Sequence, residues 1–175
     1  MKIESPAYTQ TDFEKFLDEQ LDHERNALAD RLERASARLA ELGPRIEAGG
    51  SESEMWSAHE VLAHIAGFSK FYGVLVHKVA GGQLTELDLL SGTNLRDSSI
   101  EQMRGIEPPE LLRMTLADHA RTAKELRTLE LAALRRSATV AGEAWFSPVS
   151  AEFLARYPLV NHLEEHVEQL ERMLG

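Results

Sequence analysis

The sequence predicts an all-α protein, a four-helix bundle with a long connection between its second and third helices. Apolar residues recur at three- and four-residue steps in four separate segments, as on the buried face of a helix. Turn-forming residues interrupt this pattern over 81–109 and again over 138–148. With 175 residues, the chain is long enough for one well-buried core, so we expect a single domain over 1–175.

The first helix is expected to begin at Thr11, because Glu14 stands three residues later in the spacing of a capping box. Glycine and proline at Gly43-Pro44 predict its end. The following segment, 47–54, is rich in Gly, Ser and Glu and is typical of an exposed connection. The predicted buried stripe of this helix comprises Leu17, Leu21, Leu28, Ala35, Leu39 and Leu42.

The second helix has the clearer start signal. Ser57 and Glu60 can each bond the free backbone amide of the other, and Trp56 stands before them as one half of a hydrophobic staple. Gly81-Gly82 predicts the end of this helix. Its apolar seam comprises Val61, Ile65, Phe68, Tyr72, Leu75 and Val79.

Two further helices are predicted. The third runs from Pro108 to Arg136, because proline suits a first helical turn. The fourth follows Pro158, and 150–157 is interpreted as an earlier turn that this proline kinks. The segments 81–109 and 138–148 are predicted to be loops.

Composition excludes several classes of function. The chain has no cysteine, so a metal site must use His, Asp or Glu, and the chain has no thiol nucleophile of its own. A formal net charge of −10 opposes binding to nucleic acid. No apolar run is long enough for a membrane span, and the first residues do not resemble a signal peptide. We therefore expect a cytoplasmic protein.

Three histidines form the candidate metal site. His162 and His166 stand four residues apart, so on a helix their Cβ atoms would lie about 6 Å apart on one face. His64 belongs to the apolar face of the second helix. Three inward imidazoles would form an open site with a position left for water or substrate. The alternative for the pair is a solvated or partly buried stripe without a metal.

The remaining histidines are given no metal-binding role. His119 falls on the stripe of the third helix, where a packed histidine is the better interpretation than a further ligand. The others, which we expect to be polar or exposed, are His23, His59 and His77.

Three polar residues near the histidines have alternative interpretations. Glu60 could accept a proton from a metal-bound water, but helix capping explains it fully. Glu165 could serve as such a base as well. Gln169, one turn after His166, could form a hydrogen bond near the site or lie at the core edge.

Two segments, WSAHEVLAHI at 56–65 and HLEEHVEQL at 162–170, resemble the DinB/YfiT-like superfamily of metal-binding bundles. The resemblance implies a four-helix bundle of up-down-down-up connection. It also implies metal ligation by one histidine of the second helix and two of the fourth, which match His64, His162 and His166. Several members of the superfamily are transferases or isomerases that use a small thiol such as mycothiol or bacillithiol, and others resemble hydrolases.

Three functions are compatible with these residues. The first is a metal-dependent S-transferase or isomerase in which a bound thiol attacks a small electrophile. The second is a hydrolase that activates water on the metal. The third is a non-catalytic protein that binds a metal or a small molecule. Zinc is the first choice of metal and nickel the second, because imidazole ligands accept both.

Two expectations concern the loops. Trp145-Phe146 predicts a homodimer, because aromatic side chains on a loop are often buried against a partner. The segment 81–109 is expected to run along the bundle and border the metal cleft, since the implied topology makes the second and third helices parallel. Its apolar pieces, 87–90 and 100–103, would cover part of the cleft. The alternative is a segment that only connects.

Overall fold

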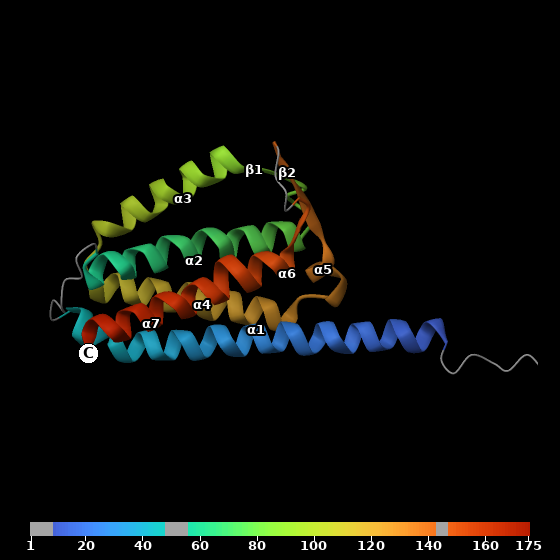
Figure 1. Cartoon of the computed structure of the whole chain (residues 1–175), viewed down its shortest axis with the longest axis horizontal. Helices are drawn as coiled ribbons and strands as arrows, with labels where there is room; N and C mark the ends of the chain where they lie inside the picture. Colours follow the sequence, from blue (N-terminus) through green and yellow to red (C-terminus); the bar gives the residue numbers. More distant parts are fainter. Residues whose placement is uncertain (1–8, 48–55, 143–146) are drawn as a thin grey trace, which may run out of the picture.

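The structure is a computed structural model that describes residues 9–47, 56–142 and 147–175. It is predominantly helical, as predicted, with long helices that lie side by side (Figure 1). The long helical elements are α1 (Gln10–Glu47), α2 (Ala58–Ala80), α4 (Pro108–Thr128) and the C-terminal series α6 (Ala151–Leu154), η1 (Ala155–Asn161) and α7 (His162–Leu174). None of the helices in the described part of the chain is long and apolar enough to cross a membrane.

Both ends of α1 differ from the prediction. The capping box is formed by Thr9 and Asp12: the amide of Asp12 donates to Thr9 Oγ1 over 3.2 Å, and Thr9 N donates to Asp12 Oδ2 over 2.8 Å. At the other end the helix continues through Pro44 to Glu47. Gly43 is buried, and a Cβ added there would lie 2.5 Å from a methyl carbon of Leu112. Gly43 therefore permits close packing of α1 on α4 and does not end the helix.

The capping box at Ser57 and Glu60 is confirmed at the start of α2. The helix ends at Ala80, where Gly81 is the cap and Gly82 adopts a positive φ of 70°. Glycine suits that conformation because a Cβ would be strained there. The segment predicted to be an exposed connection, 47–54, lies outside the described residues except for Glu47, which ends α1.

The prediction of a loop over 81–109 is wrong. This segment contains a short strand, β1 (Glu86–Asp88), and a helix, α3 (Leu89–Arg104), that packs against α2. In Figure 1, α3 lies along α2, and α2 and α4 run in the same direction. A Cβ on Gly67 would lie 2.9 Å from Cα of Ile100, so the two helices approach closely at this point. The segment therefore follows the bundle as a helix.

Two further predictions are corrected near the C-terminus. The predicted third helix ends at Thr128, and a short helix α5 (Leu131–Arg135) follows. The guanidinium of Arg25 donates to the carbonyl of Leu129, which stabilises the break between them. The predicted loop over 138–148 contains β2 (Ser137–Ala141). This strand pairs in parallel with β1 and antiparallel with β3 (Val149–Ser150), in the order β1-β2-β3.

The C-terminal helix begins earlier in the chain than predicted, before Pro158. Ser150 caps α6, since its hydroxyl accepts the amide of Phe153 over 3.1 Å. Pro158 lies inside the π-helical segment η1. A π-helical turn accommodates proline because the backbone bond that proline cannot donate is already displaced. The helix therefore passes Pro158 and continues into α7.

Ion pairs fix α7 against α1. The guanidinium of Arg38 donates two bonds to Glu171, over 2.8 and 2.6 Å. Arg31 pairs with Glu164 in the same way and also donates to Asn161 Oδ1 over 2.8 Å. The opposite face of α7 is apolar, and Leu163, Val167 and Leu170 are fully buried in the core. These contacts set the rotation of α7 about its axis, and with it the direction of the side chains between the two faces.

Candidate metal centre

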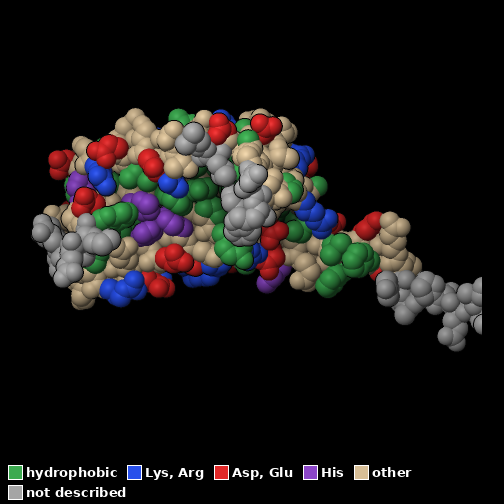
Figure 2. Space-filling model, turned by 45° about the horizontal axis from the view of Figure 1, so that its top comes forward, with side chains coloured by type: hydrophobic (Ala, Val, Ile, Leu, Met, Phe, Trp, Pro, Cys, Tyr) green, Lys and Arg blue, Asp and Glu red, His purple; other side chains and the backbone are tan. Residues whose placement is uncertain are grey.

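The structure brings His64, His162 and His166 together. Their side chains come from α2 and α7, and one ring nitrogen of each lies within 4.8 Å of the other two. All three residues are half-buried. In Figure 2, histidine side chains gather on one face of the molecule beside hydrophobic side chains. The i and i+4 spacing on α7 places two of the rings one above the other, as the sequence predicted.

The distances within this cluster suit a shared cation. Nε2 of His162 lies 3.1 Å from Nε2 of His64 and 3.1 Å from Nε2 of His166. Nitrogen ligands about 2.0–2.1 Å from a tetrahedral zinc ion would be separated by about 3.3 Å. These two separations are therefore close to those that a zinc-like ion requires, and the third nitrogen pair lies within 4.8 Å.

A count of protons supports the same conclusion. Each of the two contacts needs one proton if it is a hydrogen bond, and Nε2 of His162 takes part in both. A neutral imidazole nitrogen carries either one proton or one lone pair, so it cannot satisfy both neighbours well. A single cation would accept a lone pair from all three nitrogens at once.

Burial, together with repulsion between the histidines, keeps the rings of His64 and His162 neutral. Burial lowers the pKa of His64 from 6.5 to about 4, and repulsion from His166 adds to the effect. Burial lowers the pKa of His162 to about 3, again with repulsion from His166 and His64. Metal binding requires unprotonated imidazole, so both lone pairs are available at neutral pH.

Aromatic rings surround the cluster. The ring of Phe68 stacks on that of His162, with centroids 3.7 Å apart and planes 10° apart. Trp56 lies against His64 at 5.0 Å and is nearly parallel to His166 at 6.4 Å. Trp56, expected to be a staple of α2, thus also lies over the site. These rings exclude water from part of the cluster.

Gln169 contacts the site, in agreement with one of its two interpretations. Its Oε1 atom lies 2.8 Å from Nδ1 of His166. Glu60 and Glu165 are the two carboxylates that were considered as bases. Glu60 accepts the backbone amide of Ser57 over 2.9 Å, and this bond lowers its pKa. Glu165 is exposed.

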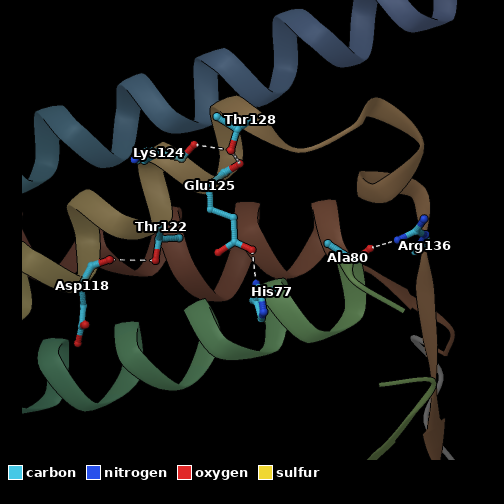
Figure 3. A network of polar contacts seen from close by, with 8 residues as sticks. All are labelled: His77, Ala80, Asp118, Thr122, Lys124, Glu125, Thr128 and Arg136. Carbon is cyan, nitrogen blue, oxygen red and sulfur yellow. Dashed lines mark hydrogen bonds and ion pairs between the residues drawn. The ribbon is translucent and has the colours of Figure 1, made fainter. Parts of the chain in front are cut away.

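The other histidines lie apart from the cluster. His119 is packed in the core, 1% exposed, and its Nδ1 lies 2.8 Å from Ser36 Oγ. His59 is half-buried rather than exposed as expected, with Nε2 2.8 Å from the carbonyl oxygen of Ile106. His77 pairs with Glu125 of α4 over 2.5 Å (Figure 3). His23 is exposed on α1.

Sequence reasoning missed Arg96, which lies on α3 near the cluster. Its guanidinium carbon lies 5.4 Å from the centroid of Phe68. Its charge contributes to the lowered pKa of both His64 and His162. An isolated arginine belongs to no motif, and α3 itself was predicted to be a loop, so no sequence signal indicated it.

No protein-family model matches the sequence, and no curated protein matches it. The structure is similar to the crystal structure of the mycothiol-dependent maleylpyruvate isomerase, with a TM-score of 0.57 and 18% sequence identity. The similarity covers 85% of this chain and 60% of that enzyme. This chain has a DinB-like fold.

The crystal structure of a histidine-to-alanine mutant of the same isomerase gives the same TM-score, 0.57, and 18% identity. It covers 90% of this chain and again 60% of the isomerase, so the chain spans about three fifths of the length of these neighbours. The predicted resemblance to DinB-like bundles is confirmed by the fold and by the histidine cluster that fits it.

Proposed function

We propose that this protein is a metal-dependent S-transferase or isomerase. In this proposal a small thiol reacts with a small electrophile. The convergence of three Nε2 atoms from α2 and α7 carries this proposal. A divalent ion held there would lower the pKa of a thiol that binds beside the histidines. Zinc is our first choice and nickel the second. The fold shared with a mycothiol-dependent isomerase supports a thiol as co-substrate.

The residues of the chain have separate roles in this proposal. His64, His162 and His166 are the ligands, and Gln169 orients the ring of His166. Trp56 and Phe68 exclude water from the reacting thiol. The thiol itself has to come from a second molecule, because the chain has no cysteine. Hydrolysis is less well supported, since Glu60 is engaged by Ser57.

The remaining features of the proposal concern the whole molecule. We propose a single domain with the up-down-down-up connection, in keeping with the directions of α1, α2, α4 and α7 in Figure 1. We also propose a cytoplasmic homodimer that acts on a small molecule and binds neither membrane nor nucleic acid, in keeping with the net charge of −10. Trp145 and Phe146, on which the dimer was predicted, lie outside the described residues.

The test is a turnover assay with metal-loaded protein. Mycothiol, bacillithiol and glutathione are each supplied with the electrophile monochlorobimane, and conjugation is followed by fluorescence. We expect turnover with at least one thiol that stops when the metal is stripped and returns when zinc or nickel is restored. Bound metal without thiol-dependent turnover would contradict the transferase proposal.

A further inference from the structure

A cavity of about 950 Å³ opens between α2, α3 and the small sheet. This volume lies near the upper end of the range for sites that bind small molecules, about 300–1,000 Å³. Most of its wall is apolar, with side chains that include Phe71, Leu75, Leu87, Val140, Phe153 and Leu154. The segment 81–109 contributes one side of the wall, so it does more than connect two helices.

An aromatic layer lies between this cavity and the histidine cluster. Tyr72 lines the cavity, and its ring lies 4.7 Å from that of Phe68. Phe68 in turn stacks on His162. The wall of the cavity and the wall of the metal centre are therefore joined by one pair of contacting rings.

Arg96 contacts the same layer from α3. It lines the cavity together with Tyr72 and lies 5.4 Å from the ring centroid of Phe68. Its Nε and Nη2 atoms donate to Asp97 Oδ1 over 2.9 and 2.8 Å. These two bonds use fewer than the five N–H donors of a guanidinium, so donors remain for a ligand.

Arg96 is more buried than the other charged residues that line the cavity. Its side chain is 27% exposed. The other charged residues of the wall are exposed: Lys70, Lys78, Glu86 and Asp88. An anion next to a partly desolvated guanidinium is held more strongly than one next to an exposed ammonium, because water screens the exposed charge more.

We propose that this cavity binds an amphipathic anion, with its apolar body against the aromatic and aliphatic wall and its anionic group on Arg96. An anion there lies next to Phe68, one ring away from His162. That this ligand is the substrate rests on the proposed function. Its binding does not require the metal, and the two can be tested separately.

Two fluorescent probes with the same apolar body test the proposal on metal-free protein. 8-Anilinonaphthalene-1-sulfonate carries an anionic group, and N-phenyl-1-naphthylamine lacks it. We expect Arg96→Met to weaken binding of the sulfonate by about tenfold or more and binding of the neutral probe by less than about twofold. Arg121→Met is the matched control, because Arg121 pairs with Asp118 on α4 away from the cavity, and it should change neither.

A second variant tests where the apolar body lies. A Cβ on Gly92 would meet the ring of Phe71 at 3.8 Å, an ordinary contact, so Gly92→Leu can fill the cavity without displacing α3. Leucine also favours the helix more than glycine, so folding is retained, which circular dichroism checks. We expect both probes to bind at least about tenfold more weakly.

Two results would overturn the proposal. One is an equal effect, or no effect, of Arg96→Met on the two probes, and the other is unchanged binding of both probes to Gly92→Leu. Either result, together with intact thiol-dependent turnover of the metal-loaded protein, would remove only this assignment of ligand class. Loss of turnover with intact probe binding would instead contradict the proposed function alone.

Discussion

Oε1 of Gln169 lies 2.8 Å from Nδ1 of His166, one turn back along α7. An amide oxygen only accepts hydrogen bonds, so Nδ1 carries the proton and the lone pair of the ring is on Nε2. Nε2 is the atom that faces His162. Gln169 thus selects the tautomer in which His166 can bind a metal ion.

Gln169→Ala should weaken zinc affinity by about tenfold to a hundredfold, the usual effect of losing a partner that orients a ligand. Gln169→Glu keeps an acceptor and should retain the affinity. Competition with a chromogenic chelator measures both. Gln102→Ala on α3 is the control, because this exposed side chain lies outside the cluster. An unchanged affinity of Gln169→Ala would show that the contact does not orient the ligand.

The sequence was most informative about the histidine cluster. His162 and His166 share a helix, so their spacing predicted that they would lie on one face, and the place of His64 on the apolar face of α2 predicted that its ring would point inward. Arg96 could not be predicted in this way. Its place beside Phe68 depends on how α3 packs on α2, which no local pattern encodes.

Gly67→Ala should destabilise the protein by about 1–3 kcal/mol. The added Cβ would lie 2.9 Å from Cα of Ile100, and backbone cannot move aside as a flexible side chain can. Gly92→Ala on α3 is the matched control: its Cβ meets only Phe71, at 3.8 Å, and it should stabilise by up to about 1 kcal/mol. Urea unfolding measures both. Equal effects would contradict the close approach of α2 and α3.

The fold was predicted less completely where local signals are weak. The helix α3 contains Gly92, Thr93 and Asn94, all poor helix formers, so its residues were interpreted as a loop. It forms because packing against α2 outweighs propensity. The strands β1 and β2 are three and five residues long and pair across about fifty residues, which sequence periodicity cannot show.

His119 should make stability depend on pH. Burial lowers its pKa from 6.5 to about 4, so between these values the unfolded chain takes up a proton that the folded chain does not. The stabilisation is complete above pH 6.5 and is lost as the pH falls towards 4. His64 and His162 contribute in the same direction in metal-free protein.

His119→Leu removes one of these groups while filling a similar volume. The loss of unfolding free energy between pH 7 and pH 4.5, measured by urea unfolding of metal-free protein, should become smaller by about 2 kcal/mol. His23→Leu, at an exposed position of α1, is the control and should retain the original dependence. The same pH dependence in His119→Leu and the original protein would refute the assignment.

Metal content per chain tests the central claim most directly. Elemental analysis of zinc-loaded, dialysed protein should give one ion per chain, and His64→Ala, His162→Ala and His166→Ala should each lose most of it while circular dichroism retains the helical signal. His77→Ala, whose imidazole pairs with Glu125, should keep its ion. Full metal content in any of the three cluster variants would remove that histidine from the site, and full content in all three would contradict the metal centre.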